Sequence, residues 1–481
     1  MTSITSTTEG TDAPPGMPRA LVALIGYFVI LATLVTTIPI KLLGQIGPDL
    51  GASGGLLNWV VIIGSLSGAI GTALLPPTAA LFGQRRVALV TMGLLTFGSL
   101  LAAFAPNMTV LLIGRFIGGF TLGAIALALV MARANLSGRA LSTVLAWIAA
   151  AEGVAAGLSF AVGGLLADTV KVDWRIIIGV LALLGLVGVV ATLVVIPAHD
   201  APSTGRVDWI GGVLLAAALA LILVPLSMGS EWGWSSATVL VPLILGAVAV
   251  AVWWRLEERV AEPLVNTRAL RNANFLRGWL VFFLAGGLTW VVNFTIPKFS
   301  ETPESAGFGF GYNGLTSGLL MLVYCLGIVL GSAGAGPLSR YVPTRVISMM
   351  AFTGCTVGML LMAFEHDQEW QIWVWSSIIG LSYGLASASA YMTFIRALRP
   401  EQVATAASMG QISAPLGGAV GSAAITGILT AQVLHIGGVS IPTQHSFQIG
   451  WLIGAGIAIV GLLLVALVRS DAAEDAAEDP N

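Results

Sequence analysis

The sequence contains very little charge. Asp, Glu, Lys and Arg together make up 9% of its 481 residues, whereas 57% of the residues are hydrophobic. A water-soluble protein of this length could not cover its surface with so few charged side chains. The sequence also has no basic tract that could bind a nucleic acid. We therefore expect an all-α integral membrane protein.

Cysteine and histidine are scarce as well. Both cysteines, Cys325 and Cys355, fall inside apolar runs, so a disulfide framework is not indicated. A membrane-embedded enzyme would need paired acids, a histidine-rich metal site or a nucleophile with its base. The histidines instead all fall between the apolar runs, so we expect neither an enzyme nor a bound metal or cofactor: His199, His366, His435 and His445.

Long apolar runs are abundant. About 20 apolar residues are needed for a helix to cross a bilayer. Fourteen runs approach or exceed this length, so we predict fourteen transmembrane helices, at 20–43, 57–79, 88–105, 109–131, 141–166, 175–197, 209–229, 237–254, 278–297, 314–336, 346–364, 371–395, 406–430 and 448–468.

The basic residues between these runs predict the orientation. Four lie on one side: Lys41, Lys171, Arg175 and Lys298. Sixteen arginines lie on the side of the chain termini: Arg19, Arg85, Arg86, Arg133, Arg139, Arg206, Arg255, Arg259, Arg268, Arg271, Arg277, Arg340, Arg345, Arg396, Arg399 and Arg469. Because cytoplasmic loops are enriched in Lys and Arg, we expect a plasma-membrane protein with both termini in the cytoplasm. Residues 1–18 and the acidic segment 470–481 are then cytoplasmic tails.

The sequence also contains an internal repeat. Thr37-Ile-Pro39 recurs as Thr295-Ile-Pro297, and Ala161-Val-Gly163 recurs as Ala419-Val-Gly421, both at an offset of 258 residues. A shared offset at topologically equivalent positions predicts two six-helix halves, 19–197 and 278–469. The segment 198–277 between them then holds two extra transmembrane helices. Paired halves with a site between them are typical of secondary transporters.

Glu152 is the acidic side chain that the sequence places deep inside an apolar run. If its helix begins near Leu141, Glu152 lies roughly 16 Å along it, near the middle of a ~30 Å hydrocarbon layer. A carboxylate there costs about 2.5–3.5 kcal/mol on insertion scales, so such residues usually have a function. We interpret Glu152 as a site for protons or cations. The alternative is a protonated glutamic acid that hydrogen-bonds to a neighbouring helix.

Several short motifs occur in an order and spacing that resemble the major facilitator superfamily, specifically its fourteen-span drug:proton antiporter branch. They cover nearly the whole chain: Asn58-Trp-Val-Val61, Gly114-Arg-Phe-Ile-Gly-Gly119, Asp173-Trp-Arg175, Asp208-Trp-Ile-Gly-Gly212, Glu231-Trp-Gly-Trp234 and Glu262-Pro-Leu-Val265. The resemblance implies a transporter that works by alternating access. It also implies that Arg115 takes part in proton relay or holds helices around the cavity.

The sequence departs from that family at three places. The turn between the second and third runs keeps Gly83, Arg85 and Arg86 of the family's conformational-switch loop, but Ala80 replaces its acid. The acid common in the first span would fall at Ala32, and the fifth span keeps only Gly163-Gly164 of the antiporter signature. If protons are coupled at all, Glu152 must then carry most of that role.

Other polar side chains in or near the spans are candidates for substrate contact. Lys41 and Lys298 are equivalent in the repeat. They could be interfacial anchors whose charge reaches the lipid headgroups, or paired cations at the outer mouth of a cavity. The remaining candidates are equally consistent with ordinary packing: Trp290, Asn293, Tyr324, Tyr383 and Gln411.

We therefore expect a monomeric exporter of amphipathic small molecules, with protons as a possible coupling ion and membrane lipids around it. An uncoupled facilitator and a lipid or glycolipid exporter stay open as alternatives. A non-transporting sensor and a membrane-embedded enzyme are more remote. Substrate identity is not encoded in any motif that the sequence presents.

Overall fold

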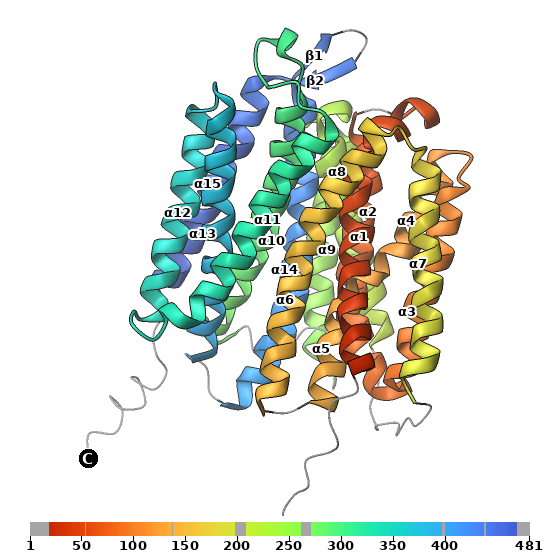
Figure 1. Cartoon of the computed structure of the whole chain (residues 1–481), viewed down its shortest axis with the longest axis vertical. Helices are drawn as coiled ribbons and strands as arrows, with labels where there is room; N and C mark the ends of the chain where they lie inside the picture. The colour runs from red at the N-terminus through yellow and green to blue at the C-terminus, as the bar shows by residue number, and fades with distance from the viewer. Residues whose placement is uncertain are drawn as a thin grey trace, which may run out of the picture.

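The computed structural model describes residues 19–52, 54–136, 138–197, 208–260, 271–396, 400–436 and 439–468. The two predicted tails, 1–18 and 470–481, lie outside these residues. Within them the chain is almost entirely helical (Figure 1). The helices are α1 (Arg19–Leu50), α2 (Gly54–Phe82), α3 (Gln84–Ala103), α4 (Met108–Gly119), η1 (Phe120–Gly123), α5 (Ala124–Asn135), α6 (Gly138–Gly164), η2 (Leu165–Thr169), α7 (Trp174–Val195), α8 (Trp209–Trp232), α9 (Ala237–Glu257), α10 (Ala273–Glu301), η4 (Glu304–Ala306), α11 (Gly314–Leu338), α12 (Thr344–Phe364), α13 (Glu369–Arg396), α14 (Pro400–Ala431) and α15 (Gln444–Ala466).

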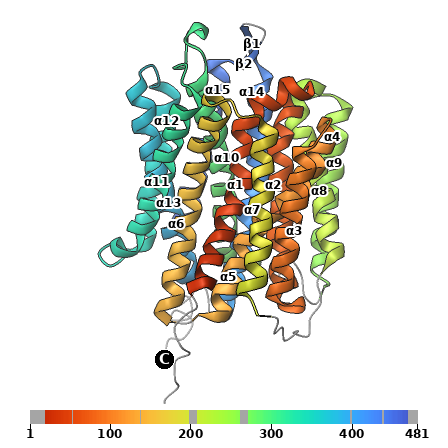
Figure 2. The same cartoon turned by 45° about the vertical axis from the view of Figure 1, so that its right-hand side comes forward.

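The prediction of an all-helical chain needs one small correction. Strands β1 (Val433–Ile436) and β2 (Val439–Pro442) pair antiparallel between α14 and α15. Figures 1 and 2 show this hairpin at the end of the helical bundle opposite to the start of α1 and the C-terminus. We call these two ends of the bundle the hairpin end and the termini end.

By length and composition, ten helices in the described residues could cross a membrane, or up to eleven if one bent pair is counted as a single span. The bent pair, Trp59–Thr72 with Leu74–Phe82, turns by 41° within α2. Its cause is local, because Pro76 and Pro77 cannot donate hydrogen bonds to the carbonyls four residues earlier. The count of fourteen spans stays a prediction.

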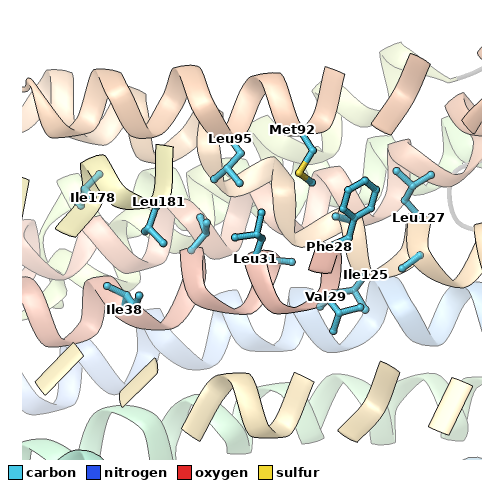
Figure 3. Close-up of a cluster of buried hydrophobic side chains, with 14 of the residues drawn as sticks. Phe28, Val29, Leu31, Ile38, Met92, Leu95, Ile125, Leu127, Ile178 and Leu181 are labelled. Carbon is cyan, nitrogen blue, oxygen red and sulfur yellow. The ribbon is translucent and has the colours of Figure 1, made fainter. Parts of the chain in front are cut away.

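Two segments of the chain have hydrophobic cores of their own. One core is built wholly within residues 21–196 and includes Phe28, Met92 and Leu181, as the close-up in Figure 3 shows. A second core joins residues of 281–468, among them Phe352 and Val465. These two segments fall within the two predicted halves of the chain, 19–197 and 278–469, which we call the first and second halves.

Helix α8 packs over the place where the two halves meet. Helices α2 and α14 contact each other directly, and α8 contacts both of them. Leu215, Leu219 and Leu223 of α8 share a buried cluster with Leu66 of α2 and Leu416 of α14. Helix α9 packs on α8, so the pair lies against one side of the α2–α14 contact (Figure 2).

Candidate functional site

Glu152 lies near the middle of α6 and away from the outer face of that helix. Trp147, Leu158 and Val162 expose their side chains on one face of α6. At 100° per residue, Glu152 is turned from the centre of that face by roughly 110°. Its side chain is nevertheless solvent-accessible.

The face of α6 next to Glu152 packs closely on the second half. A Cβ built on Gly153 would lie 2.5 Å from a methyl carbon of Val329 in α11, and one on Gly157 would lie 2.7 Å from Leu322. Glycine at these positions allows the two helices to approach each other. The side chain of Glu152 lies within electrostatic range of Tyr383 on α13.

Three hydroxyl groups gather on the second half around that position. The Tyr383 hydroxyl donates a hydrogen bond to the Ala285 carbonyl of α10 at 3.2 Å, and Thr289 donates to the same carbonyl at 3.0 Å. The hydroxyls of Tyr324 and Tyr383 both lie against Thr289. Tyr324 is 1% exposed, whereas Tyr383 is half-buried. Of these three, Tyr383 is the side chain within electrostatic range of Glu152.

The other predicted contact residues are more dispersed. Trp290 of α10 is half-buried and packs on Gly418 of α14, where a Cβ would lie 2.5 Å from its indole nitrogen. Asn293, one turn further along α10, is buried. Gln411 belongs to α14, but its side chain lies outside the described residues. The structure joins Tyr324 and Tyr383 in one hydrophobic cluster, against which Trp290 also packs.

Arg115 is buried against α2 and not against Glu152. Its Nε donates to the Val60 carbonyl at 3.1 Å, and its Nη2 lies 2.9 Å from a Cβ built on Gly64. Across the described parts of the chain, neither Arg115 nor Glu152 forms an ion pair. The contacts of Arg115 thus correspond to the helix-holding role that the family resemblance implied.

Lys41 forms a charged contact between the halves at the hairpin end. Its side chain is 2% exposed, and its ammonium group pairs with the carboxylate of Glu301 at the end of α10. It also donates to the Ser317 hydroxyl of α11 at 2.8 Å and lies 6.0 Å from the ring centroid of Phe160. This burial contradicts the interpretation of Lys41 as an interfacial anchor, because its charge is satisfied inside the protein.

Lys298 and Asp168 complete this group of charges. Lys298 is solvent-accessible and lies within electrostatic range of Glu301. Asp168, in the π-helical turn η2, is exposed and lies within electrostatic range of both Lys41 and Glu301. The repeat-related lysines therefore converge on the same carboxylate, Glu301.

Four other acids fall near the ends of helices that could cross a membrane: Asp49, Asp168, Glu257 and Glu301. These helices continue past the apolar runs from which the spans were predicted, so acids at their ends were counted as loop residues. Glu301 could have been recognised three residues after Lys298 on the same helix, whereas no sequence signal pairs it with Lys41.

The predicted switch loop lies at the termini end, between α2 and α3. Gly83 has a φ of 89°, a conformation that favours glycine. Arg85 donates to the Leu193 carbonyl at the end of α7 at 3.1 Å, and Arg86 is exposed. The loop thus contacts α7 of its own half. No group of three or more potential metal-ligating side chains occurs in the part of the chain that the structure describes.

Comparison with known proteins gives a consistent family. The model of the Major Facilitator Superfamily matches residues 23–210 and 209–422. The chain is 26% identical over 476 residues to the MFS-type transporter EfpA of Mycobacterium tuberculosis, covering 92% of this chain and 86% of EfpA. It is 25% identical over 384 residues to the multidrug resistance protein Stp of the same organism, covering 78% of this chain and 69% of Stp.

Solved structures of transporters share the fold. The nucleoside transporter NupG matches with a TM-score of 0.61 at 14% identity, over 94% of this chain and 98% of NupG. The Escherichia coli xylose transporter XylE, in a partially occluded inward-open conformation, matches with a TM-score of 0.61 at 13% identity, over 94% of this chain and 99% of XylE. At such identities these matches support the fold alone.

Proposed function

This chain belongs to the Major Facilitator Superfamily, and from that membership we propose that it exports amphipathic small molecules by alternating access. As a member it is a multi-pass membrane transporter with a small-molecule substrate, and the expectation that it is not an enzyme is confirmed. Export of drug-like compounds is the finer proposal. The name of the relative Stp, a multidrug resistance protein, supports it.

The observation that carries the proposal is the position of Glu152. Its side chain is exposed on α6 and lies within electrostatic range of Tyr383 in the second half. Phe160 and Val61 of the first half are buried in a core of the second half together with Phe299 and Trp451. Contacts at the hairpin end therefore close that end over a polar position deeper in the bundle, an arrangement that alternating access requires.

Glu152 is the residue that we propose to couple transport to protons. An isolated carboxylate surrounded by apolar helices is stabilised in its protonated form, so it can load a proton and release it when its surroundings change. Arg115 then has a supporting role, because its contacts hold α4 against α2. Tyr324 and Tyr383, with Trp290 and Asn293, supply the surface against which an amphipathic substrate would lie.

The topology that accompanies this proposal has fourteen spans in the plasma membrane, with both termini cytoplasmic, and a monomeric chain. We propose with it that the chain belongs to the fourteen-span drug:proton antiporter branch. Two six-helix halves, 19–197 and 278–469, would move against each other. The inserted helices α8 and α9 would stay on the side where α2 meets α14, and the termini end would face the cytoplasm. Gly83, Arg85 and Arg86 would then form the cytoplasmic switch loop.

Efflux from proteoliposomes tests the proposal. Purified protein is reconstituted, and a panel of cationic, neutral and anionic amphipathic compounds is measured with and without an imposed pH gradient. We expect at least one compound to accumulate against its gradient only when the pH gradient is present. Transport that ignores the gradient would favour the uncoupled facilitator or lipid exporter, and no transport of any compound would contradict export.

A further inference from the structure

The end of α6 at the hairpin end has an unusual backbone. It widens into the π-helical turn η2, and the Val172 amide then donates to the Leu166 carbonyl at 2.8 Å, closing the chain over Lys171. Lys171 has a φ of 58°, and among the described residues it is the one residue other than glycine with a positive φ. Glycine commonly takes this position after a helix, because a Cβ disfavours the left-handed conformation. The sequence therefore places a lysine where the backbone is strained.

Gln45 of α1 holds this turn from both sides. Its side-chain amide donates to the Ala167 carbonyl at 2.6 Å and to the Val172 carbonyl at 3.2 Å, and these two carbonyls flank Lys171. Ala167 is 2% exposed, and its carbonyl is among the last of its helix, which lack partners within the helix itself. Gln45 therefore satisfies a buried backbone group and stabilises the left-handed turn at the same time.

The turn carries Asp168 onto the second half of the chain. Gly314 is the first residue of α11, and a Cβ built on it would overlap Oδ2 of Asp168. The carboxylate thus lies against the start of α11, where the helix dipole favours a negative charge. Lys41 and Glu301 also lie within electrostatic range of Asp168, but they have opposite charges and pair with each other. The start of α11 is therefore the attraction that joins Asp168 to the second half.

We propose that Gln45 is a positioning residue of the transport cycle, which holds the strained turn in the shape that brings Asp168 to α11 and so favours the closed hairpin end. The proposal rests on the proposed alternating-access function. Gln45 and Lys171 both belong to the first half, so the brace persists when the halves separate. Only the contact of Asp168 with α11 is made and broken. Gln45 therefore acts on closure through Asp168.

Two relations between variants follow from this order of causes. Because Gln45 acts through Asp168, changing both residues should open the hairpin end no further than changing one. Because the turn is strained at Lys171, a glycine at that position should make the brace from Gln45 less necessary. A glutamine that merely packed between α1 and η2 would show neither relation.

Distances between spin labels measure closure directly. Phe104 follows α3 and Phe364 ends α12, and both are exposed at the hairpin end but belong to different halves. A second pair, Phe104 with the exposed Val170, lies within the first half and reports the turn itself. Each pair is replaced by labelled cysteines in a background where the buried Cys325 and Cys355 are alanines. Pulsed electron paramagnetic resonance of the full chain in lipid nanodiscs, without substrate, then gives the open and closed populations.

We expect Gln45→Met to raise the ratio of open to closed protein about fivefold, the factor that a carboxylate at an exposed helix N-terminus contributes at most. The distance between Phe104 and Val170 should change as well. Asp168→Asn should raise the ratio to a similar extent, and the double variant should not exceed it. Adding Lys171→Gly to Gln45→Met should recover at least half of the change, whereas Lys171→Ala, which keeps a Cβ, should recover none of it.

A matched control and the contrary outcomes complete the experiment. Gln432→Met changes an exposed glutamine at the same end and should behave as the parent. If Gln45→Met alters the distance within the first half but not the distance between the halves, the turn does not control closure and the proposal is wrong. Additive effects of Gln45→Met and Asp168→Asn, or equal recovery by Lys171→Ala, would overturn it too. These distances are measured without transport, so failure of the efflux assay would count against export and not against this contact.

Discussion

His366 shows how a single buried side chain makes the stability of this protein depend on pH. It is 3% exposed, packs against Phe299 and Trp451, and shares a 2.8 Å hydrogen bond with Gln444. It lies in the loop between α12 and α13. Burial lowers the pKa of its imidazole below the ordinary value, because the charged form loses its hydration.

The sign of this shift predicts a loss of stability in acid. The unfolded chain, in which histidine has a pKa near 6.5, binds a proton that the folded chain resists, so stability falls as the pH drops below about 6.5. Each pKa unit corresponds to ~1.4 kcal/mol. The midpoint temperature of thermal unfolding in detergent should be lower at pH 5 than at pH 7.5. This difference should be smaller in His366→Gln. A variant of the exposed His445 should keep the pH dependence of the parent. If it loses as much of that dependence as His366→Gln does, the effect does not come from His366.

Arg115 allows a structural role to be distinguished from a proton relay. Arg115→Met removes the hydrogen bond from the charged guanidinium to the Val60 carbonyl of α2, and hydrogen bonds to charged groups contribute about 1.5–3 kcal/mol. We expect a lower unfolding midpoint and normal pH-driven transport for each folded molecule. Arg340→Met, at an exposed position, should change neither. Normal stability with lost pH-driven transport would instead support the relay.

The helices α6 and α11 depend on small residues where they meet at the hairpin end. Gly318→Val would place a Cβ 2.4 Å from the Phe160 carbonyl oxygen, a backbone atom that cannot move aside. We expect the two helices to separate there, so that a spin-label pair at Val170 and Phe364 reports a longer distance than in the parent and active transport is lost. Gly334→Val on the same helix meets nothing within 4 Å and should retain transport. Normal closure in Gly318→Val would contradict this packing.

The helices themselves were predictable because their apolar runs match the length of a bilayer crossing, and a helix satisfies its own backbone hydrogen bonds there. Gly417 and Gly421 lie four residues apart, a spacing typical of close helix packing, and both approach the α10 backbone at Phe283 and Gly287. The bend of α2 and the π-helical turn η2 were not predicted. They depend on local prolines and on contacts with other helices, which apolar periodicity does not report.

The site was only partly predictable for the same reason. The depth of Glu152 followed from its place in an apolar run, and Tyr383 was named without any sign that it lies within electrostatic range of Glu152. The pairing of Lys41 with Glu301 joins residues 260 positions apart in the chain. Pairings of this kind arise from how the two halves meet, so a single sequence contains no direct signal for them.

The topology of the whole molecule can be tested with single cysteines placed at opposite ends of the bundle. Arg86 begins α3 at the termini end, and Glu304 follows α10 at the hairpin end. In intact cells a membrane-impermeant maleimide should label a cysteine at position 304 and reach one at position 86 only after the cells are opened. Labelling of both positions from the same side would contradict the proposed fourteen-span arrangement.

Active transport by the Glu152→Gln variant tests the central claim most directly. The substitution keeps the size of the side chain and much of its hydrogen bonding, but it removes the proton site. In proteoliposomes with an imposed pH gradient, we expect the variant to lose accumulation of substrate while it still binds substrate and exchanges it downhill, and Glu304→Gln to accumulate substrate normally. Undiminished pH-driven accumulation by well-folded Glu152→Gln protein would contradict the account and leave Glu152 a structural residue.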